Sequence, residues 1–194
     1  MTNIKENSRS YAMPKLSVGM QSIAAVGAVI AALLLPQALH LLGKATGTAS
    51  ALGEVFLPMH LPVLLVGILA GAYAGAATGL LAPIISYLLT GMPGAVLLPF
   101  MTIELAVYGL TIGLLRNIRM FTAFKVLLAQ IAGRAVRALA IVFAVYVLET
   151  STIALSIIWT SIRTGIAGIL IQLVLIPIVV YFVRKAEGHE QEAA

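Results

Sequence analysis

The sequence predicts an all-α integral membrane protein, a single bundle of six transmembrane helices with both termini in the cytoplasm. Hydrophobic residues make up 61% of the chain and its mean hydropathy is +1.06, whereas an average soluble domain is roughly 45–50% apolar. The apolar runs approach the roughly 20 residues that a membrane-spanning helix needs. We therefore expect a leader at residues 1–16, one membrane domain at 17–185 and a tail at 186–194.

The first helix is expected at Ser17–Leu42, after the basic leader, and a connection rich in Gly, Thr, Ser and Ala follows at Gly43–His60. The second helix starts at the Pro58–Pro62 stretch and continues through VLLVGILAGAYAG. The third is ATGLLAPIISYLL. Both are short, and we expect Pro83 to interrupt the third, because proline removes a backbone donor.

The last three helices are longer. The fourth is AVLLPFMTIELAVYGLTIGLL, which ends at the loop Arg116–Arg119. The fifth is expected at Phe121–Leu148 and the sixth at Thr152–Val183.

Positive charges are distributed unequally between the two ends of this bundle. With the N-terminus inside, the outer side carries one basic residue, Lys44. The cytoplasmic ends carry eight: Lys5, Arg9, Lys15, Arg116, Arg119, Lys125, Arg184 and Lys185. This asymmetry is typical of membrane proteins and requires an even number of spans. A five-span alternative, in which the second and third helices merge, would place three of these residues outside, so we reject it. We expect Lys125 to extend its ammonium to the membrane edge.

Several chemistries are absent from the sequence. There is no cysteine, which excludes disulfides and thiolate metal sites. No GxxxxGK[ST], HExxH or GxSxG motif occurs, and the helices contain no paired carboxylates. We therefore expect a protein that is not an enzyme, with no catalytic residue, metal or cofactor. Its high isoelectric point, about 9.8, reflects the cytoplasmic loops, so we expect no nucleic-acid partner.

Small residues recur at four-residue spacing in two places, and such spacing lets another helix approach closely. One series, which we interpret as tight helix packing, consists of Gly67, Gly71, Gly75 and Gly79. The other lies along the first helix and consists of Ala24, Ala28 and Ala32. The alanine strip is either internal packing or a contact surface for a partner subunit, and its spacing fits both.

Four ionisable residues lie inside the apolar segments: Glu104, Arg134, Arg137 and Arg163. A charge at bilayer depth costs roughly 2.5–3.5 kcal/mol on insertion scales, so it usually faces a partner, a cavity or a ligand. Arg134 and Arg137 lie one turn apart near the middle of the fifth helix. Their candidate polar neighbours are Tyr87, Gln130 and Gln172.

Glu104 and Arg163 are expected at similar depth in the outer half of the bilayer. Tyr108 lies one turn from Glu104, Trp159 one turn from Arg163, and His60 at the outer entrance of the second helix. An aromatic wall with a few fixed polar groups is typical of a small-ligand site. Three alternatives stay open: an ion pair of Glu104 and Arg163 that only joins two helices, a His60 that only shapes its loop, and a Trp159 that anchors the membrane interface.

The stretch LPMHLPVLLVGILAGAYAGAATGLLAPIISYLLTGMP, followed by PFMTIELAVYGLTIGLL, resembles the substrate-binding S components of energy-coupling factor (ECF) transporters, the vitamin importers of prokaryotes. The resemblance is strong over Leu57–Leu115 and is greatest to the pantothenate-type members. It implies a vitamin bound near the outer surface, where His60, Glu104, Tyr108, Trp159 and Arg163 are expected. It also implies a membrane scaffold (T) subunit and two ATPase subunits as partners in the prokaryotic plasma membrane. The alanine strip matches the scaffold-docking positions of this family.

Pantothenate carries one carboxylate, with which Arg163, or Arg134 and Arg137, could pair. This chemistry equally suits folate or a queuosine precursor, and pyridoxal and hydroxymethylpyrimidine are further vitamin-class alternatives. Two other functions remain: a stand-alone secondary transporter that uses Glu104 as a proton site, and a membrane assembly protein whose buried charges are only structural.

Overall fold

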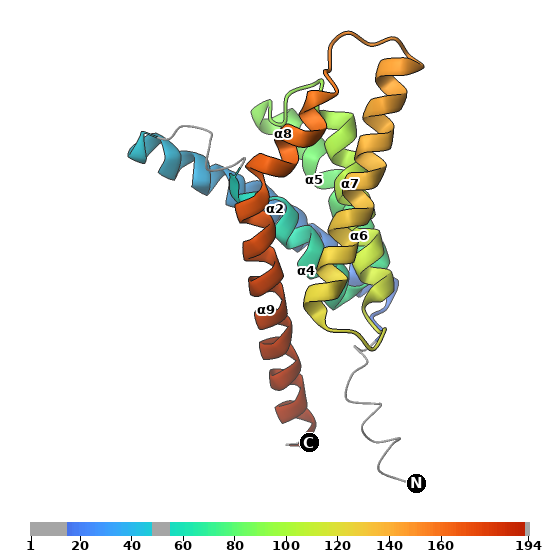
Figure 1. Cartoon of the computed structure of the whole chain (residues 1–194). Helices are drawn as coiled ribbons and strands as arrows, with labels where there is room; N and C mark the ends of the chain where they lie inside the picture. Colours follow the sequence, from blue (N-terminus) through green and yellow to red (C-terminus); the bar gives the residue numbers. More distant parts are fainter. Residues whose placement is uncertain (1–14, 48–54, 193–194) are drawn as a thin grey trace.

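The structure is a computed structural model that describes residues 15–47 and 55–192, with side chains as far as residue 186. The described part is all-helical and has no strand. Its helices are α2 Val18–Thr46, α4 His60–Ala70, α5 Ala72–Thr90, α6 Leu98–Leu115, α7 Thr122–Tyr146, α8 Ser156–Thr164 and α9 Ile166–Glu192 (Figure 1). Most of the predicted leader, part of the connection after the first helix and the side chains of the tail lie outside the described residues.

Five of the described helices are long and apolar enough to cross a membrane: α2, α5, α6, α7 and α9. The all-helical membrane fold is thereby confirmed. The sixth apolar helix, α4, has 11 residues, which at about 1.5 Å per residue give it a length of about 16 Å. This is half of the roughly 30 Å hydrocarbon core, so the count of six spans stays a prediction.

The boundary between the second and third helices was predicted too late in the chain. The prediction assigned the GAYAG segment to the second helix, but α4 ends at Ala70 and α5 begins at Ala72. Gly71 separates them with a φ of 124° and a ψ of 176°, a conformation that residues with a Cβ rarely adopt. Pro83 lies inside α5 without interrupting it, which corrects the second expectation about this region.

The predicted sixth helix is two helices. Gly165 ends α8, and its N–H donates to the carbonyls of Ser161 and Arg163. α9 then continues to Glu192, beyond the expected end at Val183. The space at this break is filled by the segment before α4, because a Cβ on Gly165 would lie 2.9 Å from Leu57 Cδ1 and one on Gly168 would lie 2.7 Å from the Phe56 carbonyl.

The remaining boundaries differ by a few residues from their predictions. α2 continues to Thr46 instead of ending at Leu42, α6 begins at Leu98 and α7 ends at Tyr146. α2 has 29 residues, about 43 Å at the usual rise, and in Figure 1 it crosses the other helices obliquely with its C-terminal part projecting from the bundle. A helix longer than the hydrocarbon core accommodates its length by tilting.

Glycines bring α5 and α6 into backbone contact. A Cβ on Gly75 or Gly109 would overlap the backbone of the other residue, and one on Gly79 would overlap Leu105. A Cβ on Gly113 would overlap Ala72. The interpretation of the glycine series as tight helix packing is therefore confirmed for these helices.

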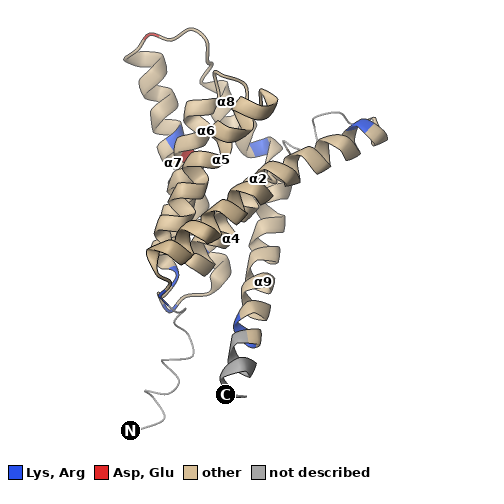
Figure 2. Ribbon diagram, turned by 180° about the vertical axis from the view of Figure 1, so that it is seen from behind, with Lys and Arg blue, Asp and Glu red and all other residues tan. Residues whose placement is uncertain are grey.

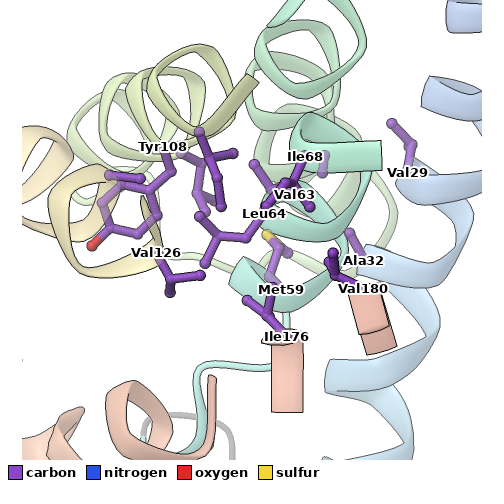
Figure 3. Packing of buried hydrophobic residues seen from close by; sticks show 14 residues of the cluster. Val29, Ala32, Met59, Val63, Leu64, Ile68, Tyr108, Val126, Ile176 and Val180 are labelled. Atoms are coloured by element: carbon purple, nitrogen blue, oxygen red, sulfur yellow. The ribbon is translucent and has the colours of Figure 1, made fainter. Parts of the chain in front are cut away.

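The hydrophobic core is centred on α4. Val63, Leu64 and Ile68 of α4 are fully buried. Figure 3 shows them surrounded by side chains from α2, α6, α7 and α9, among them Val29, Tyr108, Val126 and Ile176. This explains how a helix too short to span the bilayer alone holds a central place in the bundle.

The alanine strip of α2 faces inward. Ala32 is fully buried in the core. Ala24 and Ala28 are partly buried against a second cluster that contains Val66, Ala70 and Ala74. The strip therefore takes part in internal packing in this structure. Its assignment to a partner-docking surface stays a prediction, and Ala32, which is 0% exposed, would reach a partner only after the helices around it move.

Basic residues gather at one end of the molecule, which we call the basic end: the loop Arg116–Arg119 and the residues Arg184 and Lys185 (Figure 2). The start of α2 and the end of α9 lie at this same end (Figure 1). Lys125 differs from its prediction. It is 2% exposed and its Nζ donates to the Arg116 carbonyl oxygen at 2.8 Å, so it does not extend to the surface.

Candidate functional site

The centre of the site is a buried ion pair between α6 and α7. Glu104 is fully buried, and its Oε2 accepts from Nη1 of Arg137 at 2.8 Å. Its Oε1 accepts from the hydroxyl of Tyr108, one turn further along α6, at 2.8 Å. Both carboxylate oxygens are thus hydrogen-bonded, as a buried charge requires if its desolvation is to be offset.

Two further residues hold Tyr108 in place. Gly133 of α7 packs against the tyrosine ring, and a Cβ there would overlap the ring. The imidazole of His60, at the start of α4, has its centroid 5.4 Å from that of Tyr108. His60 is buried and interacts electrostatically with Glu104, Arg134 and Arg137. Its Nδ1 has no hydrogen-bond partner in the part of the chain that the structure describes.

Arg134 lies one turn before Arg137 on α7. It interacts electrostatically with Glu104 but, among the described residues, forms no salt bridge with an acidic side chain. The Nε of Arg134 is buried without a hydrogen-bond partner among the described residues. Its guanidinium extends toward the break between α8 and α9, since a Cβ on Gly165 would lie 3.4 Å from Nη2. One arginine of the pair thus forms a salt bridge with Glu104, and the other interacts with this carboxylate only at longer range.

A small cavity with an accessible volume of about 10 Å³ opens beside these charges. Its lining, contributed by α6, α7 and α8, consists of Glu104, Arg134, Arg137, Ala138, Ile141, Ile158, Ser161 and Ile162. We call it the charged cavity. Glu104 lies in the first half of α6 and Ala138 and Ile141 in the second half of α7, so the charged cavity lies toward the end of the bundle opposite the basic end. Figure 2 shows acidic and basic residues side by side at this level of α6 and α7.

The structure brings together five of the seven predicted ligand-site residues: His60, Glu104, Tyr108, Arg134 and Arg137. The other two, Trp159 and Arg163, lie on α8 and do not line the charged cavity. Trp159 is 70% exposed and Arg163 is also exposed. The alternative ion pair of Glu104 and Arg163 is not formed, because Arg137 occupies that position.

Two of the three expected polar neighbours of the arginines, Gln130 and Gln172, bond to one another instead, and Tyr87 is not among the residues that line the charged cavity. Gln130 Nε2 donates to Gln172 Oε1 at 2.8 Å, joining α7 to α9. Gln172 Nε2 donates to the Leu57 carbonyl at 3.3 Å.

Sequence reasoning missed the residues of α8 that close the charged cavity: Ile158, Ser161 and Ile162. Their three- and four-residue spacing places them on one helix face, different from the face of Trp159 and Arg163. The sequence feature that could have indicated this cavity-facing side is the pattern of apolar residues between polar ones in SIIWTSIRT. Gly133 was also missed, and its only signal was a small residue beside Arg134 in the middle of a membrane helix.

The charged cavity is suited to holding an anion by hydrogen bonds. Two guanidinium groups and one carboxylate leave a net charge of +1 (2 − 1) on its lining. Among the described residues, no group of three or more His, Cys, Asp or Glu side chains could hold a metal ion.

The family model described as "ECF transporter, substrate-specific component" matches residues 19–180. Searches of curated proteins and of solved structures returned no match. Members of this family are small-molecule-binding membrane subunits that work with a T subunit and an ATPase module. Because the match covers most of the chain, the protein belongs to the family of ECF transporter substrate-specific components.

Proposed function

We propose that this chain binds an anionic water-soluble vitamin in the charged cavity, and that pantothenate is the first candidate. The observation that carries the proposal is Arg134, a guanidinium with a buried Nε and no hydrogen bond or salt bridge among the described residues, beside the Glu104–Arg137 pair. A second, half-buried cation that shares one carboxylate with Arg137 is only partly compensated. A ligand carboxylate would satisfy it, and arginine binds carboxylates in a two-point geometry.

Pantothenate offers complementary groups for the other polar atoms. Its hydroxyl and amide groups can donate to Glu104 or accept from Ser161, and its gem-dimethyl group can contact Ile158 and Ile162. The resemblance of Leu57–Leu115 to pantothenate-type members supports the same choice. Folate, a queuosine precursor, pyridoxal and hydroxymethylpyrimidine are the alternatives within the vitamin class, and of these folate carries carboxylates as pantothenate does.

We further propose that the charged cavity expands to admit its ligand. Its accessible volume of about 10 Å³ is far below the roughly 300–1,000 Å³ typical of small-ligand sites. The element best able to move is α8, since none of its residues is buried and it is bounded by the break at Gly165 and the loop after α7. Outward displacement of α8 would open the cavity at the end opposite the basic end.

The proposed topology has six crossings, with α4 counted as a short one, and both termini in the cytoplasm of a prokaryotic cell. The basic end supports this orientation, because Lys and Arg concentrate on the cytoplasmic side. The chain is then a transport subunit without enzymatic activity, and ATP hydrolysis takes place in its partner subunits.

Thermal unfolding of the purified chain with a panel of vitamins tests the substrate. A ligand at a hundredfold excess over its Kd stabilises the folded state by about 2.7 kcal/mol. The panel includes pantothenate and its neutral analogue, in which a hydroxymethyl group replaces the carboxylate. We expect stabilisation by pantothenate and little by the analogue. Stabilisation by a different vitamin would correct the substrate, and equal stabilisation by both compounds would remove the role of Arg134.

A pair of variants tests the residue. Arg134→Met is expected to weaken pantothenate binding by about 2–5 kcal/mol, as for a buried charge partner, without destabilising the empty protein. Arg163→Met removes the same charge from an exposed position on α8 and serves as the control. A loss of affinity in the control as large as in Arg134→Met would contradict the assignment.

A further inference from the structure

A second unpaired cation lies at the basic end, far from the charged cavity along α7. The Lys125 side chain is 2% exposed, and its Nζ makes one hydrogen bond within the described residues, to the Arg116 carbonyl oxygen at 2.8 Å. An ammonium group has three N–H donors. Two of them are therefore without a partner in the described part of the chain.

The neighbour of Lys125 on α9 is also basic. Arg184 acts on Lys125 through a repulsive electrostatic interaction. The Arg184 side chain is half-buried, and its Nε is buried without a hydrogen-bond partner among the described residues. α7 and α9 pack together, so these two like charges are held near each other.

No described carboxylate is available to neutralise this pair. The acidic side chains that the structure describes are Glu104, which is bonded to Arg137 and Tyr108, and Glu149, which is exposed in the loop after α7. Two buried or half-buried cations with unused donors form a site for an anion that comes from outside the described residues.

We propose that Lys125 and Arg184 bind the phosphate group of an anionic phospholipid at the basic end. The surroundings favour a lipid as the source of the phosphate. Phe121 and Phe124 precede Lys125 in sequence, are 79% and 56% exposed, and have ring centroids 6.4 Å apart. They offer an apolar surface for acyl chains directly beside the cationic site, and basic sites at the cytoplasmic ends of membrane helices suit lipid headgroups.

The test measures thermal unfolding of the full chain in nanodiscs of phosphatidylcholine alone or with phosphatidylglycerol. We expect phosphatidylglycerol to raise the Tm of the unaltered protein by several degrees. Lys125→Met and Arg184→Gln should each lose at least half of this rise. Arg119→Gln, which removes an exposed charge from the same end, is the matched control and should keep it.

Lys125→Met also has an expected result in phosphatidylcholine, where replacing an unpaired buried charge by an apolar residue should leave the Tm equal or higher. If Lys125→Met keeps its Tm in phosphatidylcholine, a smaller response to phosphatidylglycerol reports lost lipid binding and not lost folding. If Arg184→Gln does not fold, the lipid-induced rise in Tm of Lys125→Met alone tests the proposal.

Four results would overturn the proposal or its source. A full lipid response in Lys125→Met, or an equal loss in Arg119→Gln, would overturn the site. No response of the unaltered protein to phosphatidylglycerol would do the same. A rise in Tm with inorganic phosphate in phosphatidylcholine, lost in Lys125→Met, would assign the site to a soluble phosphate.

Discussion

The α5–α6 interface and the region around the charged cavity are held together in opposite ways. At α5–α6, Gly75 and Gly109 bring the two backbones into direct contact. Around the charged cavity, side chains of α6, α7 and α8 line the space between the helices, and the contact includes the ion pair of Glu104 and Arg137. Backbone contact without intervening side chains permits one arrangement, whereas side chains around a cavity can rearrange.

This difference indicates how the molecule could respond to a ligand. Inside a membrane, helices associate through close packing and hydrogen bonds, because lipid is as apolar as their side chains. The glycine interface therefore forms the rigid part of the bundle. α8 has no buried residue and follows an exposed loop, features typical of segments that open at low free-energy cost.

The largest expected effect comes from the ion pair. Glu104→Gln should reduce the free energy of unfolding by about 3–5 kcal/mol, because it leaves Arg137 charged and buried without its counter-ion. The double variant Glu104→Leu with Arg137→Met should recover most of this loss, since it removes both charges. Chemical or thermal unfolding in detergent measures both. A double variant no more stable than Glu104→Gln would show that this region is as intolerant of change as the glycine interface.

A single methyl group tests the glycine interface. Gly109→Ala should destabilise the protein by about 3 kcal/mol, at the upper end for an overpacked site, since its Cβ would overlap the backbone of Gly75. Gly27→Ala on α2 is the control, because a Cβ there meets nothing within 4 Å. Alanine there should be neutral or stabilising by up to about 1 kcal/mol. Similar stabilities of the two variants would contradict the comparison.

A smaller effect is expected at Tyr108. Tyr108→Phe keeps the ring packed against Gly133 but removes the hydrogen bond to Glu104, and should cost about 1.5–3 kcal/mol. The measurement is again unfolding, with Tyr73→Phe on α5 as the control because that side chain is 55% exposed. An unchanged stability would mean that Glu104 is adequately bonded by Arg137 alone.

The smallest effect is expected at Trp159. Trp159→Ala should change stability by less than about 0.5 kcal/mol and leave vitamin affinity within a factor of two or so, because the indole is 70% exposed and does not line the charged cavity. Isothermal titration measures the affinity. A tenfold loss would place Trp159 in the bound complex and imply that α8 turns when the ligand binds.

Several features were determined by the sequence alone. Hydropathy and run length are local properties, and they predicted an all-helical membrane protein. The same holds for the identity of the ionisable residues, since Glu104, Arg134 and Arg137 lie within apolar segments whatever the packing. The close packing of the glycine series was also predictable, because the absence of a side chain has the same consequence wherever two helices meet.

The tertiary structure decided which partners these residues have. Glu104 pairs with Arg137 and not with Arg163, because the break at Gly165 creates a separate helix on which Arg163 is exposed. Ala32 is inside the core because α2 turns its alanine face toward α4. Sequence spacing specifies which residues share a helix face. The rotation of each helix about its axis depends instead on contacts between segments that are distant in the chain. These long-range contacts determine which side chains line the charged cavity.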